Sequence, residues 1–205
     1  KTHPVKIWIN DFDNNGIRGK ILTRSINGKD MPVFLKHDLE KQVPGLKKQN
    51  RKHGDFARKS IQALFPATAI EKSVVKEFNF CSTVVAINNG NGKFSVKKLP
   101  VRAQLNSVHA IRSLDVNGDG NEDVVIAGNE FGFLPQFGRL DAGFGDILLS
   151  DGLGHFKTVD PRETGLCVKG QVRDIAPIDI KQDTGLLFLI NDAVPSLYKI
   201  RKRGN

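Results

Sequence analysis

The chain has 205 residues, a net charge of +9 and 39% hydrophobic residues, which fits a folded globular protein and argues against overall disorder. No apolar run approaches the roughly 20 residues that a membrane helix needs, so we expect no helical membrane span. No signal peptide is visible at Lys1, and the chain begins abruptly inside what looks like a repeat, so we expect a fragment.

The basic charge is concentrated in two places. Residues 36–59 hold eight basic and three acidic side chains, and the second cluster consists of Lys199, Arg201, Lys202 and Arg203. Nucleic acid is the first partner to consider for a basic chain. This clustering favours instead a solvated helical face and a charged tail.

The first predicted elements, in chain order, are a strand at residues 5–9 and an Asp-rich turn at residues 11–16. From residue 36 to residue 66 the apolar period changes from two to about 3.6, which indicates helix. Pro44 and Pro66 break this stretch. We predict two or three short helices, inserted between strands, that cover an edge of the sheets.

Two kinds of sequence block recur along the chain. The first is an apolar alternation that leads into an Asp-rich turn, and its equivalent turn positions are Asp11, Asp115 and Asp179. The second is an apolar strand, a turn with two glycines and a Phe that begins the return strand, found at residues 84–94 and 147–156. Glycine supplies the positive φ angles that such turns require.

The blocks follow one order: Asp loop, strand, strand, Gly hairpin, strand. This order occurs twice in full, with the helical insertion at residues 36–66 inside the first unit, and a third copy starts at Val172. About four short strands per unit is typical of a propeller blade. The sequence therefore predicts an all-β fold, a partial β-propeller over residues 1–205 with about two full blades and part of a third.

One Asp loop has the pattern of a calcium site. Oxygen-bearing residues stand at positions 1, 3, 5, 7 and 9, and Gly120 at position 6 permits the sharp turn; the predicted ligands are Asp115, Asn117, Asp119, Asn121 and Asp123. An EF-hand would need a Glu at position 12, where Ile126 stands in an apolar strand. The alternative is an Asx-rich turn without a metal.

The other two loops are less complete. The first is a weaker candidate calcium site, formed by Asp11, Asp13, Asn15 and Ile17, because position 9 is Gly19 and offers no side-chain ligand. In the third loop, Lys181 occupies a ligand position, and we expect no metal there.

On these residues the sequence resembles the FG-GAP/VCBS repeat family, which includes the integrin α-chain propeller. The residues that carry the resemblance are 114–129 and 149–156; residues 138–145 and the helical insertion resemble large bacterial repeat proteins with an ASPIC-type domain. The resemblance implies a seven-bladed propeller in the complete protein, calcium loops that brace its blades, secretion or surface display, and adhesive binding. Two units and part of a third cannot close such a ring.

A further loop is the best candidate for ligand recognition. Residues 129–146 hold aromatic and charged side chains between glycines, a composition typical of binding hot spots: Phe131, Phe133, Phe137, Arg139 and Asp141. The alternative is that the Phe side chains pack inward and Arg139 pairs with Asp141.

Signatures of known enzymes are missing: there is no nucleophile elbow, no zinc-protease motif and no phosphate loop. We therefore predict a non-enzymatic binding or adhesion module with a protein or glycan ligand, located outside the cell, in the periplasm or on the cell surface. The alternatives are a domain of a secreted polymer-degrading protein and, less favoured, a nucleic-acid binder. Exposed sheet edges would also favour self-association.

The chain has two cysteines, Cys81 and Cys167, and their spacing forms no metal motif. Their pairing in an oxidising compartment remains an open alternative. We expect two buried thiols.

Overall fold

The computed structural model describes residues 3–181 and 183–201, and the chain divides into two compact units, Lys1–Cys81 and Ser82–Asn205. Thirteen strands in the described residues form several antiparallel sheets, which confirms the predominantly β fold. The described strands do not show a propeller, and none of their sheets closes. Lys202 and Arg203 of the predicted basic tail lie outside the described residues.

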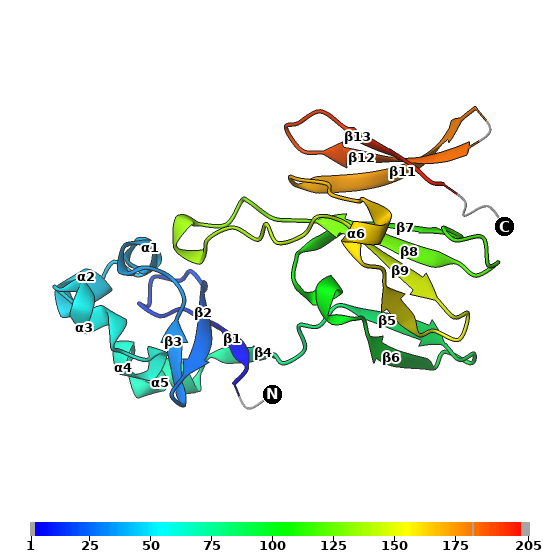
Figure 1. Ribbon diagram of the computed structural model, residues 1–205. Helices are drawn as coiled ribbons and strands as arrows, with labels where there is room; N and C mark the ends of the chain where they lie inside the picture. The colour runs from blue at the N-terminus through cyan, green and yellow to red at the C-terminus, as the bar shows by residue number, and fades with distance from the viewer. Residues whose placement is uncertain (1–2, 182, 202–205) are drawn as a thin grey trace. The chain divides into compact units, whose positions relative to one another are not determined.

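The first unit is built on a four-stranded sheet with the order β3-β2-β1-β4 (Figure 1). Its strands are β1 (Val5–Asn10), β2 (Gly19–Ile26), β3 (Lys29–Pro32) and β4 (Val74–Phe78). Asn27 and Gly28 join β2 to β3 with φ angles of 51° and 74°. Positive φ at both turn positions matches the twist of a two-residue hairpin, so β3 pairs with β2 immediately.

Five short helices follow β3 in the described part of this unit: α1 (Lys36–Gln42), α2 (Leu46–Gln49), α3 (His53–Ala57), α4 (Ile61–Leu64) and α5 (Ala67–Glu71). They are more numerous than predicted and continue past residue 66. Pro66 ends α4 and is the N-cap residue of α5, because its fixed φ suits the start of a helix as well as its end.

The helices cover a face of the sheet, so the prediction that they cover an edge is wrong. Trp8 and Ile21 lie opposite each other on β1 and β2 and share one core with buried helical side chains such as Leu39, Ile61 and Leu64. The Trp8 indole N–H donates a 3.0 Å hydrogen bond to the Thr23 hydroxyl within this core. Burial of apolar surface outweighs any gain from covering an edge.

The second unit contains three sheets. A hairpin is formed by β5 (Val84–Asn88) and β6 (Phe94–Lys98); a four-stranded sheet by β7 (Val108–Leu114), β8 (Asp123–Gly128), β9 (Asp146–Ser150) and β10 (Phe156–Thr158); and a three-stranded sheet by β11 (Val172–Ile180), β12 (Asp183–Ile190) and β13 (Ser196–Lys199). Each is an antiparallel meander of consecutive strands. Short helical turns are η1 (Val101–Gln104), η2 (Pro135–Phe137) and α6 (Pro161–Thr164).

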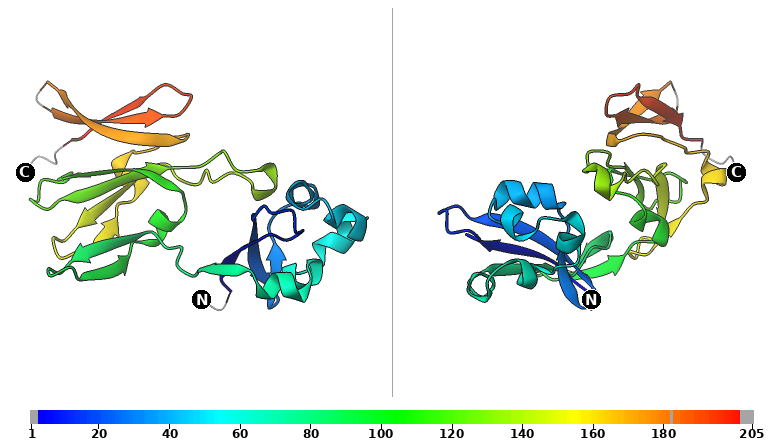
Figure 2. Two further views of the ribbon diagram at one scale, coloured as in Figure 1. Left: turned by 180° about the vertical axis from the view of Figure 1, so that it is seen from behind. Right: turned by 90° about the vertical axis from the view of Figure 1, so that its left-hand side faces the viewer.

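The middle sheet, β7–β10, packs against a core on each face and lies between the other two (Figure 2). Val125 and Ala127 of β8 belong to a core shared with Ile175 and Phe188 of the β11–β13 sheet. Ile126 and Leu148 belong to a second core with Ala103 of η1. Alternate residues of β8 thus serve opposite faces, which explains why this strand is an unbroken apolar run.

The first repeat unit does not form one blade as predicted. The repeat would place β2 beside β5, as β8 lies beside β9. Among the described strands, however, β2 pairs with β1 and β3, while β5 pairs with β6. The Asn27-Gly28 turn brings β3 to the edge of β2 over a very short loop, and a short loop closes at a lower entropic cost than a long one.

The Gly hairpins are confirmed: Gly90 and Gly92, and likewise Gly152 and Gly154, all have φ between 70° and 84°. The expectation of buried thiols is wrong, since Cys81 and Cys167 are free and exposed.

Candidate functional site

The loop between β7 and β8 is organised by the Asp115 carboxylate. One carboxylate oxygen of Asp115 accepts the N–H of Gly118 at 2.7 Å and that of Asp119 at 3.2 Å, and the other accepts that of Gly120 at 2.9 Å. The turn also requires glycine, because Gly118 and Gly120 have φ of 81° and 86°. The carboxylate at position 1 therefore holds the loop closed around itself.

Asn117 and Asp119 lie on the exposed side of this loop. The Asn117 amide nitrogen lies 2.9 Å from the Asp119 carboxylate, and the second Asp119 oxygen accepts the Asn121 N–H at 2.8 Å. The Asn121 N–H and then the Asn117 amide hold the pKa of Asp119 below its ordinary value. A carboxylate that stays charged is the form that binds a cation.

Asp123, at position 9, faces the sheet instead. It is fully buried, and its two oxygens accept the N–H of Val116 at 3.0 Å and of Ser150 at 2.9 Å. Asp123 thus ties the loop to β9 as well as to its own beginning. The motif alone could not assign this bond, because Ser150 lies far along the chain.

The donor set of the loop fits an oxygen-liganded cation. One oxygen of Asp115 and both oxygens of Asp119 each accept a single hydrogen bond and retain acceptor capacity, whereas the other Asp115 oxygen already accepts two. Calcium takes six to eight such oxygens in a tolerant geometry. In residues 3–181 and 183–201, however, no three His, Cys, Asp or Glu side chains are grouped so as to hold a metal ion. Asn and backbone oxygens would have to complete the set.

The equivalent loop of the first unit has the aspartate at position 1 but has Gly19 at position 9. The Asp11 carboxylate accepts the N–H of Asn15 at 3.0 Å and of Gly16 at 2.8 Å, and these bonds, Gly16 first, hold the pKa of Asp11 below its ordinary value. The Asn15 side chain accepts the Ile17 N–H at 2.7 Å. Asp13 lies beside Asp11 and contributes to the lowered pKa.

The loop of residues 129–146, termed here the recognition loop, is anchored at Asn129. The buried Asn129 amide donates to the carbonyl oxygens of Gly143 at 2.8 Å and Gly170 at 3.0 Å, and it accepts the Gly143 N–H at 3.0 Å. Asn129 adopts φ of 86°, which Asn tolerates better than most residues. One side chain therefore closes the base of the loop.

Glu130 adds a second set of contacts at this base. Its carboxylate accepts the Gly132 N–H at 2.8 Å and lies 3.3 Å from the His109 ring and 3.5 Å from the Arg173 guanidinium. The Gly132 N–H first, and then Arg173 and His109, lower the pKa of Glu130. His109 thus has a structural partner. Sequence reasoning missed the Glu130 contacts, because His109 and Arg173 lie far from Glu130 along the chain.

The tip of the recognition loop exposes apolar side chains. Phe133 is 45% exposed and Phe137 is 46% exposed, so these two do not pack inward. Arg139 lies over the Phe131 ring at 3.8 Å in a cation–π contact. No ion pair between Arg139 and Asp141 is found in the described residues, so Asp141 remains outside this stacked pair.

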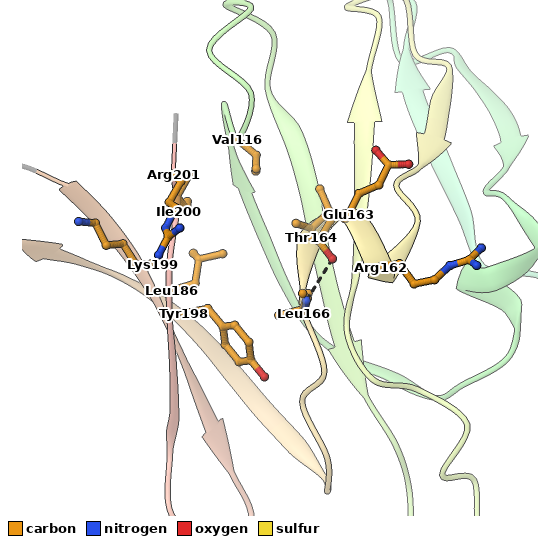
Figure 3. Close-up of a pocket in the computed structure, with 12 residues that line it drawn as sticks. Val116, Arg162, Glu163, Thr164, Leu166, Leu186, Tyr198, Lys199, Ile200 and Arg201 are labelled. Carbon is orange, nitrogen blue, oxygen red and sulfur yellow. Dashed lines mark hydrogen bonds between the residues drawn. The ribbon is translucent and has the colours of Figure 1, made fainter. Parts of the chain in front are cut away.

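A cavity of about 470 Å³ lies between the β7–β10 and β11–β13 sheets (Figure 3). Its apolar lining, Val116, Leu166 and Leu186, continues the core between the sheets. Two of its cations are already paired, Arg162 with Asp160 at 2.8 Å and Lys199 with Asp183. We therefore interpret this cavity as a gap in the packing between the two sheets.

Neither a scan against models of protein families nor a search of curated proteins found a match for this chain. In the described residues, no helix is long and apolar enough to cross a membrane.

Proposed function

We propose that this chain is a non-enzymatic binding module of propeller-like blades, braced by calcium. The observation that carries the proposal is the loop at the β7–β8 turn of a four-stranded meander, where the Asp115 carboxylate accepts N–H groups of a glycine-dependent turn and Asp119 adds a second charged carboxylate on its exposed side. In this proposal Asp115, Asn117 and Asp119 hold the ion, the Asn121 carbonyl completes the set, and calcium supplies a rigid crosslink within the turn. Asp123, a predicted ligand, instead braces the loop against β9 through its buried carboxylate.

The recognition loop is the proposed contact surface. It presents Phe133, Phe137 and a stacked Arg139 on a base that Asn129 and Glu130 hold in place. Exposed aromatic residues with arginine are typical of binding hot spots, and a fixed base reduces the entropy lost on binding. We propose a protein ligand for this surface; a glycan ligand is the alternative.

An enzymatic role has less support. Among the described carboxyl groups with a shifted pKa, each is lowered: Asp11, Asp119, Glu130, Asp151 and Asp160. A general acid of the kind that cleaves polysaccharides would need a raised pKa. A nucleic-acid role is also less favoured, because Phe56, the aromatic residue among the basic helices α1–α3, is buried and cannot stack on bases.

The proposed calcium site also favours a location outside the cytosol. Loops of this kind in extracellular modules bind calcium at roughly millimolar concentrations. We therefore propose an extracellular, periplasmic or surface location.

Calcium titration by calorimetry, with melting curves in calcium and in chelator, tests the proposal. We expect saturable binding and a melting temperature that rises with calcium, and the loss of both in Asp119→Ala. At a calcium concentration one hundred times the Kd, the stabilisation would be about 2.7 kcal/mol.

The matched control is Glu122→Gln, which removes a charge from the same exposed loop without removing a predicted ligand. It should retain calcium binding. Absence of binding at millimolar calcium, or equal loss of binding in both variants, would reduce the loop to an Asx-rich turn.

A further inference from the structure

In the described part of the second unit, the outer edge of β5 has no strand partner, whereas the same edge of its counterpart β9 has one. The hairpins β5–β6 and β9–β10 share one sequence pattern, in which Phe94 corresponds to Phe156. The outer side of β9 is paired with β8, whereas β6 is the single partner of β5 among the strands described in this unit (Figure 1). Within the residues of the second unit that the structure describes, no strand lies beside this edge of β5.

The hydrogen bonds of the hairpin show which backbone groups face that edge. The Asn89 N–H donates to the Lys93 carbonyl oxygen at 2.9 Å, and the Leu99 N–H donates to the Thr83 carbonyl oxygen at 3.1 Å. Hydrogen-bonded pairs alternate along an antiparallel ladder, so Val85 and Ile87 also face β6. The groups that face outward are therefore the N–H and C=O of Val84, Ala86 and Asn88.

The corresponding groups of β9 are paired. Counted from the shared Phe, Ala86 corresponds to Leu148, which lies opposite Val124 of β8 and is fully buried. Asn88 corresponds to Ser150, whose N–H is bound by Asp123. Ala86 and Asn88 are instead exposed. The same strand pattern is thus interior in one sheet and terminal in the other.

The sequence of β5 is also that of an interior strand. Every other strand at a sheet edge in the described residues carries a charged side chain; examples are Lys157 of β10 and Lys199 of β13. Residues 84–88, Val-Val-Ala-Ile-Asn, contain no charge, proline or bulge. Natural proteins place charges, prolines and bulges on edges to prevent strand addition, and β5 lacks all three.

Contacts at both ends hold the β5–β6 hairpin in one conformation. At its open end the Gln104 side chain accepts the Thr83 N–H at 2.7 Å and donates to the carbonyl oxygens of Thr83 and Leu99. At its closed end Gly90 and Gly92 supply the positive φ angles of the turn. A strand that is already ordered loses less entropy when it gains a partner.

We propose that β5 pairs with β5 of a second copy of this chain, antiparallel and about a two-fold axis at Ala86. In this arrangement Ala86 meets its own copy and Val84 meets Asn88, so every outward N–H faces a C=O. A two-fold interface must be self-complementary, and an uncharged strand meets itself without like-charge repulsion.

Sedimentation velocity of the full chain tests this proposal, once with calcium and once with chelator, so that its outcome is independent of the calcium site. We expect a species of twice the 22.6 kDa chain mass, in equilibrium with monomer. Ala86→Pro removes one outward N–H and spares the bonds to β6, and it should weaken the dimer by about tenfold or more. The matched control is Val96→Pro, which sits opposite Ala86 and alters the other edge; it should retain the dimer.

A second pair of variants tests whether loss of the dimer results from misfolding. Ala86→Lys places like charges opposite each other in the dimer, and Val96→Lys adds the same charge one strand away; circular dichroism verifies that each variant is folded. A monomer at all concentrations, open-ended assembly, or equal weakening by changes at residues 86 and 96 would overturn the proposal.

Discussion

The two Asp loops begin alike but are held in place by different means. In both, the first aspartate, Asp11 or Asp115, accepts N–H groups of its own turn. The second-unit loop is then tied to β9 by the buried Asp123 carboxylate. The first-unit loop has Gly19 at that position and buries Phe12 instead, whose ring lies 4.6 Å from that of Phe65.

The difference shows that one motif can be anchored by polar or by apolar contacts. Where a third strand lies beside the loop, a carboxylate bonds to its backbone. Where helices cover the sheet, as in the first unit, an aromatic side chain enters their core. The predictions below test this contrast.

The largest effect is expected from Phe12→Ala. The substitution leaves a cavity beside Phe65, and loss of a buried Phe side chain typically costs about 3–5 kcal/mol in the free energy of unfolding. Denaturant unfolding followed by fluorescence measures this, because Trp8 is the single tryptophan of the chain and lies in the same core. Ile17→Ala, in the same loop but 72% exposed, should change stability by less than about 0.5 kcal/mol. If Phe12→Ala and Ile17→Ala changed the free energy of unfolding equally, Phe12 would not be the apolar anchor of the first-unit loop.

The next largest effect on the free energy of unfolding is expected from Asp123→Asn. An amide can accept one of the two N–H groups but presents its own N–H₂ to the other, which leaves a buried donor without an acceptor at a cost of about 1–3 kcal/mol. Amide hydrogen exchange should show faster exchange at Val116 and Ser150. Exchange at Phe12 should stay unchanged if each loop has its own anchor.

The smallest effect is expected in the exposed turn between β9 and β10, which has no counterpart of the Asp123 or Phe12 anchor. The Asp151 carboxylate binds the backbone N–H and the ring of His155 and the N–H of Leu153, which lower its pKa to about 2. Because the pKa is lower in the folded state, this contribution to stability is present above the ordinary value of 3.8 and is lost as the pH falls through about 2. An NMR titration of the carboxyl carbon should give a midpoint near 2. A midpoint near 3.8 would mean that these bonds are absent in solution.

Local chemistry made much of the second unit predictable. The Gly hairpins, the apolar run of β8 and the Asp-rich turn follow from φ preferences and side-chain alternation within a few residues. The exposed Asn27-Gly28 turn carries an equally local signal, and it would have predicted the β2–β3 hairpin that prevents the first repeat unit from forming a single blade.

The sequence by itself determined the strands, the turns and the oxygen-rich loops, because each depends on neighbours along the chain. Only the tertiary structure decided that Asp123 is a buried anchor, that Asn129 closes the recognition loop and that the outer edge of β5 has no strand partner in the described part of its unit. Each of these depends on residues far away in the sequence, such as Ser150 and Gly170, and pairing at that distance is selected by burial and competing loop closure.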